Sequence, residues 1–493
     1  MKRRNVMPVA WVAAVFACQA VGVQDHAPLV VAEHPSPAPP SLVEKPRVLG
    51  EIGRRIAAAA PGDTIEIAKG VYHEHIVIDK PLTLVGHDRP VIDGDNSGDI
   101  VEIRVPDVAM RGFTIRHTGI DLDKENTAIR VLAGRATIED NILEDVLFGI
   151  DLREAPDCVI RNNHVGAKLL DIARRGDGLR LWRADRTGIE GNHFRNGRDA
   201  IVWYSKGVTI RGNTATDCRY GLHLMYSDDV VIENNTLTGN SVGVYLMYST
   251  GVELRHNTLV RNRGPSGYGI GLKDTDLFTV RDNLISQNRV GVYVDGSPFS
   301  NRKPGEFSGN TLAYNDIGFT FLPSARGNQL FENNFIDNID QVSVAGRGRL
   351  DANTFWKGER GNFWSDYSGY DQNADGIGDF VHESQTIFEN MMDKEPKLRL
   401  FLFSPAQQAV EFVGRALPSI RPEPKFVDEV PLMRPVPVPA DLSTIDLGGI
   451  GLALSAAMLL GVGCAVLFIV RTDGTRLRDA TRPSTSPMKG AQA

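Results

Sequence analysis

Short segments of alternating apolar and polar residues repeat at a nearly constant spacing through the middle of the chain. In the three clearest units an asparagine closes one segment, and a glycine eight residues later opens the next apolar strand. Asn213, Asn235 and Asn257 lie 22 residues apart. A fixed period of roughly 20–50 residues is the signature of a solenoid, whose units bury their apolar faces only by stacking. The clearest units are Asn213 with Gly221-Leu-His-Leu224, Asn235 with Gly243-Val-Tyr-Leu246, and Asn283 with Gly291-Val-Tyr-Val294.

This unit predicts an all-β fold, a right-handed single-stranded parallel β-helix over residues 47–354. The asparagine at one turn is expected to stack on its copy in the next coil, which satisfies buried amide groups along a ladder. Glycine supplies the positive φ that tight turns require. Outside the central run the same marker occurs at Asn141, Asn163, Asn192, Asn310 and Asn334.

Both ends of the repeat have the features of caps. Residues 50–60 predict a short amphipathic helix with Ile52, Ile56 and Ala59 on one face, which would cover the open first coil. Residues 355–440 are expected to form a C-terminal cap, with a helical stretch from Ser404 to Val413, and a Pro-rich tail.

The two ends of the chain predict export and a membrane anchor. Residues 1–23 place a basic start before an apolar run, as in a signal peptide, and the Pro-rich residues 24–46 predict a linker. Residues 447–470 carry no charge and are long enough for a transmembrane helix. The basic tail 471–493 is then cytoplasmic. The β-helix is expected in the periplasm, anchored to the inner membrane by a C-terminal single transmembrane helix.

Charge, cysteines and missing motifs remove several classes of function. A net charge of −7 gives no electrostatic reason to expect nucleic acid. No CxxC or cysteine cluster occurs, which excludes a thiolate zinc site or an iron–sulfur cluster; a disulfide between Cys158 and Cys218 is left open. The sequence has no P-loop, Gly-x-Ser-x-Gly or His-Glu-x-x-His, so neither ATP hydrolysis nor ester or peptide hydrolysis is supported.

The strand after each coil glycine carries the candidate chemistry. With Ala200 in the place of the glycine in one coil, strand alternation puts Ile201 and Trp203 inward and Val202 and Tyr204 outward. The outward positions then form an exposed stripe with two flanking residues: Trp182, Tyr204, Met225 and Met247, with His223 and Tyr245 beside them.

Three interpretations of this stripe stay open. Coils stack about 4.8 Å apart, so His223, Met225 and Met247 can converge, and thioether with imidazole suits copper(I). Alternatively, an apolar stripe on the surface indicates a partner surface, which would include Trp182, Tyr204 and Tyr245. In the third interpretation a loop or the C-terminal tail covers the stripe as ordinary core.

Two further motifs are candidates for metal binding. His73-x-His75 lies at a strand edge with both rings on one face, either as a metal site or as a solvated edge. In Asp371 to Asp379, the residues Asp371, Asn373, Asp375 and Asp379 match ligand positions of a calcium loop, but the twelfth position is His382 instead of Glu. Calcium and an Asx-rich turn without metal both fit this stretch.

Several of these motifs together resemble the NosD family. They are Arg219-Tyr-Gly-Leu-His-Leu-Met-Tyr-Ser-Asp228, Leu246-Met-Tyr-Ser249, Gly361-Asn-Phe-Trp-Ser-Asp-Tyr367, Asp371 to Asp379 and Pro431-Leu-Met-Arg-Pro435.

The resemblance covers about residues 47–435 and implies a periplasmic β-helix that assists copper-centre assembly of nitrous oxide reductase without being an enzyme. It implies an ABC-type ATPase and a membrane subunit as partners, together with nitrous oxide reductase and a copper chaperone. The C-terminal membrane helix departs from what the resemblance implies and puts the mode of docking in doubt.

The main hypothesis is therefore a membrane-tethered periplasmic component of an ABC-type system for copper-centre maturation. Copper would bind transiently, and calcium would be structural. The alternative is a carbohydrate-active β-helix protein, a uronate lyase, epimerase or glycan binder, because parallel β-helices often have such activities. A structural scaffold without a small ligand is the third hypothesis.

Overall fold

The computed structural model describes residues 49–300, 303–346, 348–384, 387–402, 404–417 and 423–438. The predicted signal peptide, linker, transmembrane helix and cytoplasmic tail lie outside these residues. Within them, no helix is both long and apolar enough to cross a membrane.

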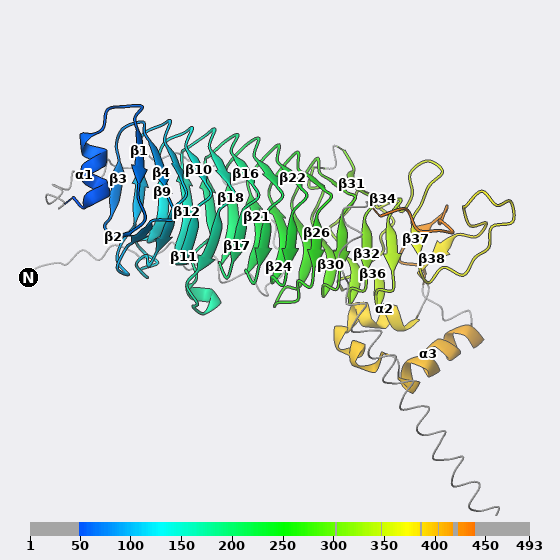
Figure 1. Ribbon diagram of the computed structural model, residues 1–493. Coiled ribbons are helices and arrows are strands. Elements are labelled where there is room, and N and C mark those ends of the chain that lie inside the picture. Colours follow the sequence, from blue (N-terminus) through cyan, green and yellow to red (C-terminus); the bar gives the residue numbers. More distant parts are fainter. Residues whose placement is uncertain are drawn as a thin grey trace, which may run out of the picture. The chain divides into compact units, whose positions relative to one another are not determined.

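The described chain forms a parallel β-helix in which each coil contributes one strand to each of three sheets, called A, B and C below (Figure 1). Sheet A has 12 strands, all paired in parallel with the coil before and after. They are β1 (Thr64–Ile67), β4 (Thr83–Gly86), β7 (Ala109–Arg111), β10 (Thr137–Glu139), β13 (Val159–Arg161), β16 (Gly188–Glu190), β19 (Thr209–Arg211), β22 (Val231–Glu233), β25 (Glu253–Arg255), β28 (Thr279–Arg281), β31 (Gly305–Ser308) and β34 (Asn328–Phe331).

Sheet B has 13 strands, the last of which comes from the C-terminal cap. They are β2 (Val71–His73), β5 (Val91–Asp93), β8 (Thr114–Arg116), β11 (Ile142–Val146), β14 (His164–Ala167), β17 (His193–Arg195), β20 (Thr214–Thr216), β23 (Thr236–Thr238), β26 (Thr258–Val260), β29 (Leu284–Ser286), β32 (Thr311–Ala313), β35 (Asn334–Ile336) and β37 (Phe363–Trp364).

Sheet C has 12 strands and contains the longest ones, which follow the coil glycines. They are β3 (Ile76–Ile78), β6 (Val101–Ile103), β9 (Thr127–Val131), β12 (Phe148–Arg153), β15 (Leu179–Trp182), β18 (Asp199–Trp203), β21 (Tyr220–Met225), β24 (Val242–Met247), β27 (Tyr268–Lys273), β30 (Val290–Asp295), β33 (Ile317–Phe321) and β36 (Asp340–Val344).

A ladder of buried asparagine side chains follows the turn between sheets A and B, as the sequence predicts. Each amide nitrogen donates to the amide oxygen of the asparagine one coil further on. One predicted member is wrong: the ladder passes through Asn333, and Asn334 begins β35, where its amide binds the backbone of Val436. The ladder members are Asn141, Asn163, Asn192, Asn213, Asn235, Asn257, Asn283, Asn310, Asn333 and Asn362.

A second buried ladder, which the sequence pattern did not reveal, follows the turn between sheets B and C. Asn262, Asn288 and Asn315 each donate to the next member, and Asn240 accepts from and donates to backbone groups at its start. Between the ladders, apolar side chains from all three sheets fill one continuous column. Both features fix the coil register, because a slip would leave buried amides unpaired.

The predicted N-terminal cap is confirmed as α1 (Glu51–Ala58), which buries Ile52 and Ile56 against the first coil. Its first backbone N–H groups lack intrahelical partners. The buried Glu74 carboxylate accepts hydrogen bonds from the backbone nitrogens of Ile52 and Gly53, each at 2.9 Å. A charged side chain from the next turn therefore fastens the cap to the coil.

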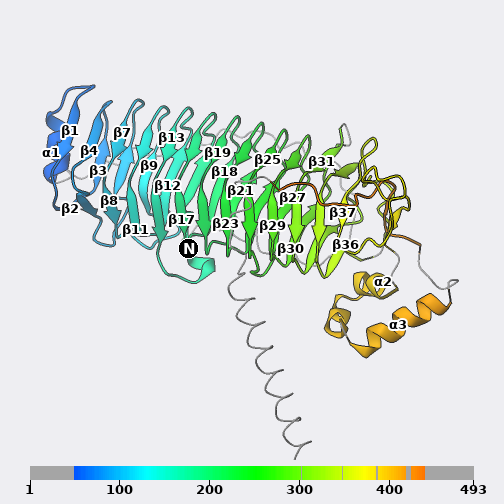
Figure 2. The same ribbon diagram turned by 45° about the vertical axis from the view of Figure 1, so that its right-hand side comes forward.

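At the other end, helices and a small antiparallel pair follow the last coil (Figure 2). The predicted helical stretch is α3 (Pro405–Ala416), whose N-cap Ser404 accepts a hydrogen bond from the backbone nitrogen of Gln407. The remaining elements were not predicted: η2 (Ile172–Arg174), β38 (His382–Glu383), α2 (Ile387–Lys394), η3 (Pro396–Phe401) and β39 (Val427–Asp428).

Candidate functional site

The outer face of sheet C carries the predicted stripe, but in a different register. Trp182 pairs with Trp203, which pairs with Met225, which pairs with Met247. Trp203 therefore occupies the outward position that the sequence assigned to Tyr204. Val202 points into the core, where it is almost fully buried.

The error has a local cause in β21. Asp199 pairs with Tyr220 and Ile201 pairs with His223, so two residues of β21 stand opposite the single Ala200. Ala200 does not take the place of the coil glycine, and counting from it shifts the strand by one residue. A one-residue slip exchanges the two faces of a strand. Ile201, predicted inward, lies outside between Arg180 and His223.

Tyr204 starts a separate row of stacked tyrosines at the turn after sheet C. Tyr204, Tyr226 and Tyr248 all have φ near +50° and follow one another coil by coil. Their ring centroids lie 5.0 Å and 4.9 Å apart with nearly parallel planes. The repeated Trp/Met-Tyr-Ser at residues 203–205, 225–227 and 247–249 is the signal that could have found this row.

Aromatic side chains connect the tyrosine row to the stripe. The Trp182 ring meets Trp203 at 5.1 Å and Tyr204 at 5.0 Å, both edge to face. Tyr204 and Tyr226 are 43% and 41% exposed. Among the described residues, no segment covers this edge. Below, "aromatic face" means these residues: Trp182, Trp203, Tyr204, Met225, Tyr226, Met247 and Tyr248.

His223 is the polar centre beside the aromatic face. Its Nδ1 lies 3.1 Å from Oδ2 of Asp199, and its Nε2 lies 3.4 Å from the sulfur of Met247. The imidazole is nearly buried, with the Tyr220 ring edge-on at 5.0 Å and the Tyr245 ring at 6.2 Å. The structure thus brings together His223 and Met247, and β-sheet pairing places Met225 directly beside Met247.

Asp199, which the sequence did not single out, fixes this imidazole. Its carboxylate has no exposed surface and accepts hydrogen bonds from Nε and Nη2 of Arg219 as well as from His223. Burial disfavours the charged form, but the hydrogen bonds from His223 and Arg219 outweigh it and lower the pKa of Asp199. An ionised carboxylate accepts from Nδ1–H, so Asp199 orients the ring with Nε2 facing Met247.

This arrangement fits copper(I) as a cargo ion. An imidazole nitrogen and two thioethers are soft or borderline donors, and a carboxylate behind the imidazole is the usual outer partner of a metal-binding histidine.

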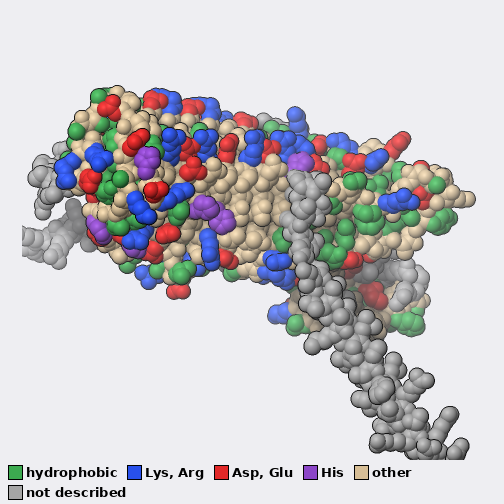
Figure 3. All heavy atoms as spheres, viewed as in Figure 1, with side chains coloured by type: hydrophobic (Ala, Val, Ile, Leu, Met, Phe, Trp, Pro, Cys, Tyr) green, Lys and Arg blue, Asp and Glu red, His purple; other side chains and the backbone are tan. Residues whose placement is uncertain are grey.

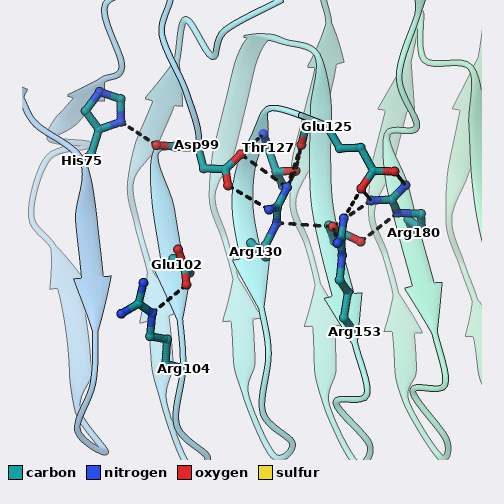
Figure 4. A network of polar contacts seen from close by, with 10 residues as sticks. His75, Asp99, Glu102, Arg104, Glu125, Thr127, Arg130, Arg153 and Arg180 are labelled. Carbon is teal, nitrogen blue, oxygen red and sulfur yellow. Dashed lines mark hydrogen bonds and ion pairs between the residues drawn. The ribbon is translucent and has the colours of Figure 1, made fainter. Parts of the chain in front are cut away.

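A second polar network occupies the same face of sheet C toward the N-terminal cap (Figure 4). Asp151, which is fully buried, accepts hydrogen bonds from Arg153 and Arg180, each at 2.8 Å, and Arg130 lies 3.5 Å away. Glu125 bridges Arg153 and Arg180 from the loop before β9. Each carboxylate is held by at least two arginines, an arrangement that favours a structural role over acid–base catalysis.

We expect Glu125→Gln to weaken the stability of the protein at neutral pH and to flatten its loss in acid. Burial opposes ionisation, but Arg180 and Arg153 lower the pKa of Glu125 to about 2 from 4.5. Its contribution is present above pH 4.5 and is lost as the pH falls toward 2. Because a third of the side chain is exposed, we expect about 1 kcal/mol.

Urea unfolding at pH 7 and pH 3 measures this effect. The exposed Glu144→Gln serves as the matched control and should match the unaltered protein at both pH values. An equal pH dependence in Glu125→Gln and Glu144→Gln would contradict the role of the network.

The predicted calcium loop has an Asx-turn geometry. Backbone nitrogens of Asp375 and Gly376 donate to Asp371, and that of Gln372 donates to Asp379 at 2.7 Å. His382, at the twelfth position, is buried with its ring stacked on Trp364 at 4.7 Å and supplies no ligand to the loop. Nothing in these contacts supports calcium over the turn without metal.

Comparison with known proteins places the chain in a family. A family model described as "Periplasmic copper-binding protein (NosD)" matches residues 162–369. A Pseudomonas aeruginosa protein named "Probable ABC transporter binding protein NosD" is 31% identical over 382 residues, which cover 75% of this chain and 87% of that protein. The chain belongs to the NosD family. A Stutzerimonas stutzeri relative with the same name is 29% identical over 380 residues, covering 74% and 85% of the two chains.

Solved structures similar to this NosD-family chain are distant from it in sequence. The A-module of an Azotobacter vinelandii mannuronan C-5 epimerase aligns with a TM-score of 0.41 and 15% identity, covering 62% of this chain and 92% of that one. The Dettilon tailspike protein aligns with a TM-score of 0.45 and 14% identity, covering 59% and 63%.

The NosD-family match contains the whole aromatic face and His223, whereas the calcium-like loop lies just beyond it.

A cavity of about 540 Å³ lies further along, between the last coil and the C-terminal cap, lined by Asp340, Tyr367, His382 and Phe426 among others. Cys158 and Cys218 are buried and free, so they form no disulfide.

Proposed function

We propose that this chain is the periplasmic β-helix component of an ABC-type system that assists copper-centre assembly of nitrous oxide reductase. Family membership and the names of the two relatives support a binding component of such a transporter. A partner ATPase would supply the energy, since the sequence has no P-loop. The chain itself acts as an accessory protein, held at the inner membrane by residues 447–470.

The observation that carries this proposal is the position of His223 between the Asp199 carboxylate and the Met247 sulfur. Copper(I) is the cargo: Nε2 of His223 and the sulfurs of Met225 and Met247 hold it, while Asp199 orients the ring. The rings of Tyr220 and Tyr245 cover His223 and restrict water. Water exclusion strengthens soft coordination and protects the reduced ion.

The aromatic face next to these ligands is proposed as the surface at which a copper-carrying partner docks. Trp182 and the exposed edges of Tyr204 and Tyr226 flank the methionines. Tryptophan, tyrosine and methionine are enriched at protein interfaces. A copper chaperone that delivers the ion and the reductase that receives it would contact this face in turn, so that transfer occurs without release into solvent.

Titration of the full-length chain with copper(I), in competition with a chromophoric chelator and without oxygen, tests the proposal. We expect one ion per chain, and at least tenfold weaker binding in Met225→Ala/Met247→Ala, because two of three ligands are lost. Both side chains are only partly buried and lie outside the core column, so the variant should remain folded.

Met391→Ala is the matched control, since Met391 is exposed on α2 away from the aromatic face. It should bind copper(I) like the unaltered chain. Equal affinity in the double variant would refute copper carriage at this site. The aromatic face would then remain as a docking surface, which pull-down of the copper chaperone with Trp182→Ala tests separately.

A further inference from the structure

A separate cluster of metal-binding side chains lies on the first coils, far along the chain from the aromatic face. His73 ends β2 and pairs with Asp93, which ends β5. Asp95 and His117 occupy the turns after β5 and β8, both with positive φ. Of the two interpretations of His73-x-His75, a shared metal site is not formed, because the His75 ring contacts the backbone oxygen of Asp99 and the hydroxyl of Ser97. Histidine side chains are visible at this end in Figure 3.

One imidazole and two carboxylates converge here, and a second imidazole contacts them from the next coil. Nδ1 of His73 lies 2.7 Å from Oδ1 of Asp95. The ligand atoms of His73, Asp93 and Asp95 all lie within 4.8 Å of one another. Nδ1 of His117 lies 3.0 Å from both carboxylate oxygens of Asp93. Three potential ligands from two successive coils therefore surround one point, and His117 supports Asp93 from the third coil.

The buried member of the cluster is already oriented. Asp93 is almost fully buried, and it accepts hydrogen bonds from Nε of Arg116 at 2.8 Å and from the backbone nitrogen of Asp95 at 3.0 Å. Together with His117, these contacts fix the orientation of the Asp93 carboxylate. Outer contacts of this kind hold metal ligands in place.

The outer members are accessible to an ion. The side chains of His73 and Asp95 are 57% and 61% exposed. Imidazole with carboxylate suits zinc or copper(II), whereas copper(I) prefers sulfur and calcium prefers oxygen alone. The interpretation without a metal is two separate surface pairs, His73 with Asp95 and His117 with Asp93. It explains each pair, but it does not explain why Asp93 lies within 4.8 Å of the ligand atoms of the first pair.

We propose that His73, Asp93 and Asp95 form a binding site for a divalent borderline cation, zinc or copper(II), at the N-terminal end of the β-helix, with His117 holding the Asp93 carboxylate in place. The site is independent of the copper(I) ligands on sheet C. Its ligands come from the first two coils, so an ion bound there also fastens these coils to one another.

Equilibrium titration of the tag-free full-length chain with zinc chloride and, in a second arm, copper(II) chloride tests this site. We expect one ion per chain, at least tenfold weaker binding in His73→Ala and in His117→Ala, and loss of the ion in the double variant. Copper(I) binding should be unchanged in these variants, which separates this test from that of the aromatic face.

His87→Ala is the matched control. His87 forms a similar exposed pair, with Glu66 at 3.5 Å, but has no second imidazole or carboxylate in the cluster. It should bind like the unaltered chain. Failure to bind either ion at about 100 µM, or equal loss in His87→Ala, would overturn the proposal. Nitrogen hyperfine splitting in the copper(II) spin-resonance spectrum, reduced in His73→Ala, gives a second readout that does not depend on affinity.

Discussion

Replacing Asn235 by alanine is expected to lower the free energy of unfolding by about 3–5 kcal/mol. Asn235 is almost fully buried at the centre of the first ladder. Its amide oxygen accepts from the backbone and side-chain nitrogens of Asn213 at 2.9 and 3.0 Å. Its amide nitrogen donates to Ile210, Glu233 and Asn257.

The size of the effect follows from what alanine leaves behind. The backbone N–H of Asn213 loses its acceptor and the backbone oxygen of Ile210 loses a donor in the interior, and each unsatisfied buried group costs about 1–3 kcal/mol. Urea unfolding of the full chain measures the loss. Asn373→Ala, in an exposed loop, is the control and should change stability by less than about 0.5 kcal/mol. Equal losses in both variants would contradict a stabilising ladder.

The ladder is also the part of the fold that the sequence predicts best. The sequence shows a 22-residue period that is marked by asparagines and coil glycines. Because these residues recur, they can be identified as equivalent positions of a solenoid repeat. Prediction failed where one coil departs from the repeat. Ala200 follows its asparagine by eight residues, as the glycines do, but it pairs with Leu179, and the extra residue in β21 becomes apparent only when backbone hydrogen bonds define the pairing. The choice of Asn334 instead of Asn333 is the same kind of error between adjacent identical residues.

The candidate site was predicted in part for a related reason. His223, Met225 and Met247 lie in a repeated stretch, so alternation alone placed them together on the outside. Asp199 comes from the preceding coil, where an aspartate on a strand looks like any solvated residue. Its burial depends on Arg219 and His223, contacts between coils that no spacing rule reports. His117 was missed beside Asp93 for the same reason, since coil stacking brings the two residues together.

Asp199→Ala should have the second large effect, on stability and on copper(I) binding together. The substitution strips a fully buried carboxylate from Arg219 and His223, and breaking a buried pair by removing one partner costs about 3–5 kcal/mol. Outer partners of metal-binding histidines contribute about 10- to 100-fold in affinity, so copper(I) should bind that much more weakly. Asp123→Ala, in an exposed loop, is the control for both measurements.

The pH dependence tells whether the charge of Asp199 is responsible. Its folded-state pKa lies below the ordinary 3.8, so its stabilising contribution is complete above that value and is lost as the pH falls below it. The difference in stability between Asp199→Ala and the unaltered chain should therefore be large at pH 7 and should shrink below about pH 4.

Asp199→Asn keeps the shape and an acceptor for His223 but lacks the charge. If it restores copper(I) affinity but not stability, orientation of the imidazole matters for the ion, and the charge matters for Arg219. If the difference in stability between Asp199→Ala and the unaltered chain stays constant from pH 7 to pH 3, Asp199 acts through packing alone.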